Sequence, residues 1–479
     1  MSSKKNMFKA LSLLPVMSAM TLVSCGGGGT SVDPAVEQVS IVAYNGGYGT
    51  DWLQDICETF TKETGIIATY SADSAILQKI ESQLTGTCEY DIFMSHGLAW
   101  QNYAKRGLLT SLDDLYATKV DGDKTFEQRV LPEALNHVKY AGADEQEHYF
   151  KVPFTQGVGG FVYNVKMFQE KGWTVPTTYE ELTTLCAKIV ADTNGSVKPF
   201  AWSGARDYYW DYPIYEWWCE LEGKQSYDAW MELKDEDGKY AKGYENWNPD
   251  TKFANFKRAF QMWYDLVGTH PEYANDKAYN ASLLNAQRAF FRQEAAMIPY
   301  AHWCKKEIEK AMKSEFTFDI AMMPTPKANP STQKNINFMV GFGDSMIVPK
   351  KARHAANAKK FLAFMSKEVA CKAFVEKADG PFLGFDYSSI DLSSITANNT
   401  YVKSLHDILK NSVNISTDSN NPILVTNGDT FIQPWVNNTR YYKDVTAGTE
   451  TGSVSDIMAK VYNSAKDSWA GWVRNAGVE

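Results

Sequence analysis

The sequence has no surplus of positive charge and lacks the short motifs that mark common catalytic and metal sites. Its 479 residues include 48 Lys and Arg against 57 Asp and Glu, a formal net charge of −9. Nucleic-acid binding depends on clustered Lys and Arg that neutralise phosphates, so this balance argues against it. The chain contains no G-x-S-x-G, H-E-x-x-H or P-loop motif, and no C-x-x-C or His/Cys cluster. We therefore expect no metal and no cofactor.

Long hydrophobic runs are scarce as well. An apolar run at residues 10–23 follows three lysines and is interrupted by Pro15 and Ser18. A membrane-spanning helix needs roughly 20 apolar residues, so this run is too short and too broken. A positively charged start, a short apolar stretch and small residues at its end are typical of a secretory signal. After Cys25 the apolar runs are short and mixed with charge, so we expect no second membrane segment.

The run ends in Leu22-Val23-Ser24-Cys25, followed by four glycines. This string resembles the bacterial lipobox, in which the cysteine is acylated after cleavage and becomes the new N-terminus. The resemblance implies a signal peptide at residues 1–24, then the acylated cysteine and a flexible tether at residues 25–37. The protein would then be extracytoplasmic and anchored to the cell membrane. An ordinary secretory signal with an incidental cysteine is the alternative.

Cysteine is sparse and widely spaced. Six of the seven follow the signal, and these are Cys57, Cys88, Cys186, Cys219, Cys304 and Cys371. An even number in an oxidising compartment allows 15 disulfide pairings. The wide spacing leaves buried free thiols as an equal alternative.

Strand and helix patterns alternate in the first part of the chain. Apolar strand-like runs occur at 39–44, 66–70 and 90–94, and helical periodicity occurs at 52–64, 74–85 and 98–105. This alternation predicts a parallel sheet with right-handed crossovers. Ligands of such sheets bind beyond the carboxyl ends of the strands, so the loops 44–50, 71–73 and 95–97 should share one mouth.

The rest of the chain adds further elements and is too long for a single core. We expect glycine-containing extended crossings at 150–164 and 338–349. Strands are predicted at 295–300 and 318–323, and helices at 250–267, 278–294 and 355–376.

Four places in the chain carry a family resemblance. Val152-Pro153 with Tyr163-Asn164 is similar to a lobe crossing, and the stretch at 290–297 resembles an F-x-x-G-x-A-A-M pattern, with Glu294 replacing the usual glycine nearby. The segment 341–349, followed by the predicted helix 355–376, resembles the return crossing. The lipobox at residues 22–25 is the fourth place that carries the resemblance. Together they resemble extracellular solute-binding protein family 1, the lipid-anchored receptors of ABC sugar importers.

The resemblance implies an α/β fold of the two-lobed periplasmic-binding-protein type (class II). Each lobe would be a mostly parallel sheet flanked by helices, and a hinge would join the two. Lobe one would comprise 38–151 plus 300–346, and lobe two 152–299 plus 347–479. A monomer of this type would capture a carbohydrate, expected to be an oligosaccharide, and deliver it to permease subunits without chemistry.

Aromatic residues are abundant, with 14 Trp, 26 Tyr and 24 Phe. Flat rings suit the C–H faces of sugars, and planar polar side chains suit their hydroxyl rims. The ligand-binding candidates on loops are therefore Tyr44, Asn45, Tyr48, Asp73, His96, Gln156, Trp202, Arg206, Tyr208, Trp210, Trp303, Asp344, Gln433 and Trp435. Some have other roles open to them. Trp210 fits the core, Asp73 a helix cap, and His96 a structural loop position.

Two other functions compete. A surface glycan-binding protein without a transporter could use the same fold. An extracellular glycosidase would need two carboxylates about 5–9 Å apart, which the linear sequence does not test. Residues 342–345 superficially match the first block of GDSL-type hydrolases, but the chain has no Asp-x-x-His to complete that site.

Overall fold

Two β-sheets organise the computed structural model, which describes residues 37–341, 343–417, 419–427 and 453–478. The predicted signal peptide, the predicted acylation site Cys25, and the candidates Gln433 and Trp435 lie outside these residues. Residues from Glu37 onward form one compact unit that contains both sheets. Within the described ranges, no helix combines the length and the apolar character needed to cross a bilayer.

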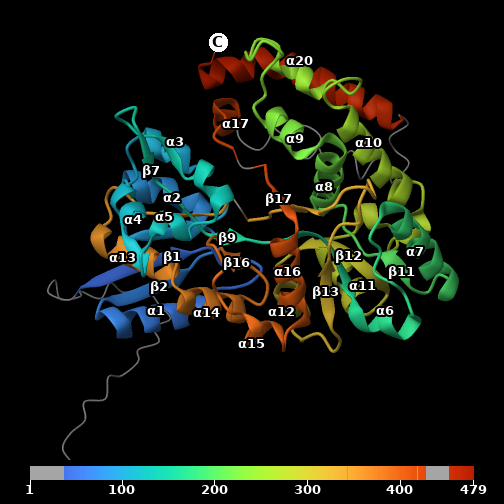
Figure 1. Cartoon of the computed structure of the whole chain (residues 1–479), viewed down its shortest axis with the longest axis horizontal. Helices are drawn as coiled ribbons and strands as arrows, with labels where there is room; N and C mark the ends of the chain where they lie inside the picture. The colour runs from blue at the N-terminus through green and yellow to red at the C-terminus, as the bar shows by residue number, and fades with distance from the viewer. Residues whose placement is uncertain (1–36, 342, 418, 428–452, 479) are drawn as a thin grey trace, which may run out of the picture. The chain divides into compact units, whose positions relative to one another are not determined.

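The first sheet has the strand order β2-β1-β3-β15-β8. Its strands are β1 (Gln38–Ala43), β2 (Ile67–Ala72), β3 (Ile92–Ser95), β15 (Ser345–Ile347) and β8 (Val152–Pro153). β1 runs parallel to β2 and β3, whereas β15 is antiparallel to β3 and β8. The helices that follow the parallel strands are α1 (Asp51–Thr64), α2 (Ile76–Thr85) and α3 (Trp100–Lys105) (Figure 1). The predicted strand–helix alternation is therefore confirmed.

The second sheet has the strand order β11-β12-β10-β13. Its strands are β10 (Gly159–Asn164), β11 (Lys198–Phe200), β12 (Ala295–Ala301) and β13 (Ile320–Met323). β11 is parallel to β12, but β10 is antiparallel to both β12 and β13. This sheet is mixed rather than mostly parallel, because β10 enters it directly from the first sheet and lies between two strands that run the other way.

Strand pairing corrects the predicted lobe boundaries in two places. The sequence analysis puts 300–346 in lobe one, whereas β13 pairs with β10 in the second sheet. It also puts 347–479 in lobe two, whereas α13 (Ala355–Met365) packs on β1 and α14 (Glu368–Ala378) packs on α1 (Figure 1). The single helix predicted at 355–376 is thus two helices, because Lys367 between them has an extended backbone.

Several stretches of chain connect the sheets. The first contains β8, β9 (Thr155–Gln156) and β10, and the second runs from β13 through β14 (Ile336–Phe338) to β15. A later stretch contains β16 (Phe382–Leu383), which pairs with β9, and leads to α16 (Thr400–Asn411), which packs on β13. β17 (Val413–Ile415) then pairs with β14. The crossings therefore support one another through hydrogen bonds.

The helices around the second sheet hold much of the aromatic content. Helices α8 (Asp211–Glu222) and α10 (Ala254–Trp263) pack against each other. Trp210, Trp217 and Trp218 have no exposed surface, and Trp218 makes edge-to-face contacts with Phe253 and Phe256. Edge-to-face pairs of this kind stabilise a core beyond the area that they bury. Most of these rings are therefore structural.

The remaining elements are short or peripheral to the two sheets. The helices are α4 (Asp113–Ala117), α5 (Phe126–Arg129), α6 (Val165–Lys171), α7 (Tyr179–Asp192), α9 (Lys224–Met231), α11 (Leu283–Phe291), α12 (Cys304–Met312), α15 (Ser393–Thr396), α17 (Pro422–Asn427) and α20 (Val454–Ala476). Two hairpins pair β4 (Lys119–Asp121) with β5 (Lys124–Thr125) and β6 (Lys139–Ala141) with β7 (Glu147–Tyr149).

All six cysteines in the described part of the chain are buried free thiols. Of the two alternatives that the sequence leaves open, the structure therefore has free thiols and not disulfides. Burial raises the pKa of the Cys57 thiol to about 12. These side chains pack as small apolar residues and are poor nucleophiles at neutral pH.

A buried carboxyl group joins α8 to the crossing strand β14. Glu216 is 3% exposed, and its Oε1 accepts a 2.6 Å hydrogen bond from the Phe338 backbone N–H. Burial raises the pKa of Glu216 from its ordinary 4.5 to about 8. The folded protein therefore holds this proton at neutral pH, whereas the unfolded chain releases it.

We expect Glu216→Gln to remove a pH dependence of stability. Between pH 4.5 and 8 the unfolded state loses this proton while the folded state keeps it, so the wild-type free energy of unfolding falls by about 1.4 kcal/mol per pH unit from this group. Gln keeps an oxygen acceptor and has no proton to lose. We measure the free energy of unfolding of both proteins with denaturant at pH 5 and pH 8. The value for the variant relative to the wild type should be higher at pH 8 than at pH 5.

Glu222→Gln, on the same helix but half-buried, is the matched control. We expect the change in stability difference between the two pH values to be larger for Glu216→Gln than for this variant. Equal differences for Glu216→Gln at pH 5 and pH 8 would contradict a protonated Glu216.

Candidate functional site

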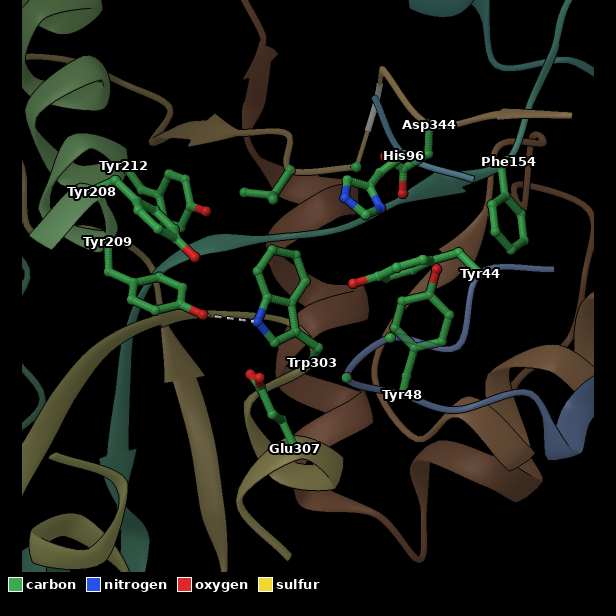
Figure 2. Close-up of a pocket in the computed structure, with 14 residues that line it drawn as sticks. Tyr44, Tyr48, His96, Phe154, Tyr208, Tyr209, Tyr212, Trp303, Glu307 and Asp344 are labelled. Atoms are coloured by element: carbon green, nitrogen blue, oxygen red, sulfur yellow. Dashed lines mark hydrogen bonds between the residues drawn. The ribbon is translucent and has the colours of Figure 1, made fainter. Parts of the chain in front are cut away.

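A cavity of about 300 Å³ lies where loops from both sheets meet (Figure 2). Its walls come from the loops after β1 and β3, the segment around the start of α8, the start of α12, and both the first and second crossings. The lining residues are Tyr44, Gly46, Gly47, Tyr48, His96, Phe154, Tyr208, Tyr209, Tyr212, Trp303, Glu307, Val340, Gly341 and Asp344. Of the three loops predicted to lie together at one edge of the sheet, the loops 44–50 and 95–97 both line this cavity.

The first wall follows the carboxyl ends of β1 and β3. The Tyr44 N–H donates to the Met94 carbonyl (2.9 Å), which continues the sheet by one residue. The Tyr44 ring meets the His96 imidazole edge-on, with 4.3 Å between centroids. Burial lowers the pKa of His96, so this imidazole is neutral at physiological pH. Both side chains come from loops that parallel strands bring to one edge of the sheet.

Trp303 forms the centre of the second wall. It lies two residues after β12, at the start of α12. Its indole Nε1–H donates to the Tyr209 hydroxyl (3.1 Å), and the Tyr209 ring stacks on Tyr300 at 4.3 Å. Figure 2 shows the indole between Tyr209 on one side and Tyr44 on the other. A hydrogen-bonded, stacked support of this kind holds the indole in one orientation.

Gly47 allows the two walls to approach each other at Trp303, because glycine has no side chain. Gly47, in the loop after β1, lies beside the indole, and a Cβ at this position would be 3.3 Å from the Trp303 Cβ. A larger residue would therefore push the loop and the indole apart. The glycine allows the first wall to approach the second.

Two carboxylates line the cavity, and each is held by a hydroxyl group. The Tyr300 hydroxyl donates to Glu307 Oε2 (2.6 Å), and the Thr155 hydroxyl donates to Asp344 Oδ2 (3.0 Å). Burial raises the pKa of Glu307 from its ordinary value. In Figure 2 the Glu307 carboxylate lies near the Tyr209–Trp303 pair, and Asp344 lies across the cavity near His96.

The structure brings part of the sequence-predicted set together. Tyr44, Tyr48, His96, Tyr208, Trp303 and Asp344 all line the cavity. Asn45 is not among the lining residues, although its neighbours Tyr44 and Gly46 are.

Two polar candidates have structural hydrogen bonds instead. Asp73 accepts from the Ala75 N–H (2.8 Å) and pairs with Lys79 (2.7 Å). These bonds hold the turn before α2 and are not the predicted helix cap, because the N-cap residue of α2 is Ala75, which has no side-chain capping bond. Gln156 is buried, and its side-chain amide donates to the carbonyls of Leu383 and Phe385. Its position in the crossing strand therefore serves the pairing of β9 with β16.

The segment that carries Trp202, Arg206 and Trp210 only partly reaches the cavity. Trp210 is fully buried and Trp202 is 3% exposed, so both rings belong to the core of the second sheet. Arg206 is exposed, and its guanidinium donates to the Ala205 carbonyl (2.9 Å). Of this segment's candidates, Tyr208 alone is among the lining residues.

Sequence reasoning missed five side chains that line the cavity, namely Phe154, Tyr209, Tyr212, Glu307 and Val340. Tyr209 is adjacent to the predicted Tyr208, and Glu307 follows Trp303 by one helical turn, so the i, i+4 spacing could have indicated it. Tyr212 likewise follows the predicted Tyr208 by four residues, whereas Phe154 and Val340 have no comparable signal. In the described part of the chain, no group of three or more His, Cys, Asp or Glu side chains is arranged to hold a metal.

We expect Tyr209→Phe to destabilise the protein by about 1 kcal/mol, because the buried side of Trp303 loses its hydrogen-bond acceptor. Denaturant unfolding followed by tryptophan fluorescence measures this change. Tyr163→Phe, at the end of β10 away from the cavity, is the matched control, and we expect a smaller loss from it. Equal losses in the two variants would contradict a supporting role for Tyr209.

Comparison with known proteins gives concordant matches. The family described as bacterial extracellular solute-binding protein matches residues 46–370. A multiple sugar-binding protein of Streptococcus mutans is 26% identical over 251 residues, and the match covers 52% of this chain and 55% of that protein. The chain thus spans about half the length of this relative.

Solved structures match over a larger share of the chain. A solute-binding protein of an ABC transporter from Thermotoga lettingae, bound to α-D-tagatose, has a TM-score of 0.62 at 16% identity, covering 90% of this chain and 99% of that one. The GacH receptor of Streptomyces glaucescens, solved with and without acarbose, has a TM-score of 0.61 at 18% identity, covering 90% and 98%. At these identities the likeness shows a shared fold, that of two-lobed solute receptors.

Proposed function

The chain belongs to the bacterial extracellular solute-binding protein family, and from this premise we propose that it captures a carbohydrate between its two lobes. In this proposal the protein works outside the cytoplasm, held by a lipid on Cys25, and presents the sugar to the permease subunits of an ABC importer. It acts as a monomer and leaves the sugar chemically unchanged.

The observation that carries the carbohydrate assignment is the composition of the cavity wall. Trp303, with its orientation held by Tyr209, offers a flat face to the C–H side of a sugar ring. Glu307 and Asp344 offer carboxylate oxygens to its hydroxyl groups. A few convergent polar groups in a mainly aromatic cavity are typical of small-molecule sites.

The cavity volume bears on the length of the ligand. Small-molecule pockets span about 300–1,000 Å³, and this cavity, at about 300 Å³, lies at the lower limit. We therefore propose that it holds one or two sugar rings, which are either the whole ligand or the end of an oligosaccharide.

Capture would be coupled to closure because both sheets contribute to the cavity. Tyr44 and His96 follow strands of the first sheet, and Trp303 follows a strand of the second. A sugar that contacts both walls at once favours the form in which the walls are close. The closed form would therefore distinguish the sugar-bound receptor from the empty one.

A thermal-shift screen of the chain from residue 30 onward against mono- and disaccharides tests the proposal. A ligand at 100 times its Kd should stabilise the fold by about 2.7 kcal/mol. We expect stabilisation by one sugar class, with the sugar recovered intact by chromatography. Stabilisation by amino acids but by no sugar would refute carbohydrate capture, and release of smaller sugars would refute the absence of chemistry.

Trp303→Ala should weaken binding of the sugar found in that screen by at least about tenfold, because the central stacking surface is lost. Trp303→Phe keeps a ring and should lose less. Trp173→Phe, at a tryptophan whose Nε1–H donates to Asp192 far from the cavity, serves as the control in the same titration calorimetry. An unchanged Kd for Trp303→Ala would place the ligand elsewhere.

A further inference from the structure

Two adjacent asparagines after β17 bond to different parts of the molecule. The Asn420 side-chain amide donates to the carbonyls of Asn136 (2.9 Å) and Lys139 (3.0 Å). The Asn421 side-chain amide donates to the carbonyl of Glu232 (2.6 Å). Asn420 and its two acceptor carbonyls together form a clasp between these parts.

The acceptors of the two asparagines lie on different sides of the molecule. Asn136 lies in the short helix Pro132–His137, and Lys139 begins β6, which packs on α3 after strand β3 of the first sheet. Glu232 directly follows α9, and α9 packs on α8, which packs on β10 of the second sheet. The clasp therefore joins the first-sheet side of the molecule to the second-sheet side.

The segment that carries the clasp belongs to the second-sheet side. It begins with β17, and α17 at its end packs on α20, which also packs on α10 (Figure 1). Asn421 is 8% exposed, and its Oδ1 accepts the Ile423 N–H (2.9 Å), so the segment is fixed beside α9. Toward the first-sheet side, α17 contacts α3, and Asn420 supplies its two side-chain bonds. A movement between the two sides therefore acts on the bonds of Asn420.

The clasp and the proposed sugar cavity lie on opposite faces of the second crossing. Phe338 stacks on Tyr212, and Val340 lines the sugar cavity together with the same tyrosine. Met339, between them in the chain, lines a different cavity, and Asn420 lines that one too. Neighbouring side chains of an extended chain point to opposite faces. The crossing thus separates the sugar cavity from the clasp.

The crossings are bonded to one another and can serve as the axis of closure. The Gln156 amide joins the first crossing to the Leu383 carbonyl (2.9 Å), and the Met339 N–H donates to the Ile415 carbonyl (2.7 Å). When the two sides turn about such an axis, approach on one face means separation on the other. Closure around a sugar therefore pulls Asn420 away from its two acceptors.

We propose that the clasp opposes closure and so sets the affinity of the protein for its sugar. The inference rests on the proposed capture of a carbohydrate by closure and adds the contact that closure breaks. Asn420 is a positioning residue in this scheme, because it does not line the sugar cavity. Its bonds stabilise the open form, and the contacts that a sugar gains in the closed form must exceed them.

Removing the clasp should tighten sugar binding. For Asn420→Ala we expect the Kd of the sugar found in the thermal-shift screen to fall roughly fivefold, because the open form loses two hydrogen bonds that the closed form already lacks. Asn420→Asp keeps the size of the side chain but cannot donate to the two carbonyls, so its Kd should fall at least as much. Titration calorimetry measures both changes.

Asn411→Ala is the matched control for the calorimetry. The Asn411 side-chain amide also donates to a backbone carbonyl, that of Asp407, but both residues lie in α16. We expect the Kd of this variant to equal that of the wild type. Melting curves of the three variants verify that they remain folded.

A distance measured across the clasp needs no sugar. Spin labels are attached to exposed positions of two helices through Lys105→Cys in α3 and Gln225→Cys in α9, while the native cysteines of the described chain are buried. Electron–electron double resonance on the sugar-free protein should give a longer distance with Asn420→Ala than with the native Asn420. Sugar should lengthen the distance in the protein that keeps Asn420.

The outcomes separate the clasp from the proposal on which it rests. An unchanged or higher Kd in folded Asn420→Ala, an unchanged label distance in that variant, or a shorter distance on sugar binding would overturn the role of the clasp and leave carbohydrate capture intact. A label distance that responds to Asn420→Ala in a protein that binds no sugar would support the clasp and refute carbohydrate capture.

Discussion

The close approach of the first crossing strand to the end of β12 is the constraint on which the cavity depends. The His302 N–H donates to the Val158 carbonyl (2.9 Å), and the His302 ring packs over Gly157. A Cβ at position 157 would lie 1.9 Å from His302 Nδ1, so this contact requires glycine. Because His302, directly after β12, is held against the crossing, Trp303 lies immediately before α12, where the loop after β1 reaches it.

The arrangement explains how a chain so rich in aromatic residues divides them between two tasks. Trp210, Trp217 and Trp218 fill the interior beside the second sheet, where their whole surface is removed from water. Trp303 and Tyr209 belong to the same region but lie where the sheet ends. The cavity therefore offers ring faces held by hydrogen bonds and stacking, with the Glu307 carboxyl group beside Trp303 and Asp344 on the opposite side. Such a cavity can discriminate ligands by shape and by hydrogen bonding.

Prediction from the sequence succeeded where local order decides position. Tyr44, Tyr48 and His96 follow strands of a regular strand–helix pattern, and parallel strands bring such loops to one edge whatever their side chains. Prediction failed where the partner is distant. Gln156 is a planar polar residue near a crossing, as a ligand contact would be, yet its amide is taken up by Leu383 and Phe385. Glu307 was overlooked because a lone carboxylate on a helix is usually solvated.

The sequence by itself determined the alternation of the first sheet, the two-lobed family resemblance and the loops from which a ligand site could be built, because these follow from periodicity and from the order of local patterns. Only the tertiary structure decided that β13 joins the second sheet and α13 and α14 the first, and which rings line the cavity. Strand partners and ring exposure depend on contacts between residues far apart in the chain, and those contacts are chosen by the packing of the whole unit.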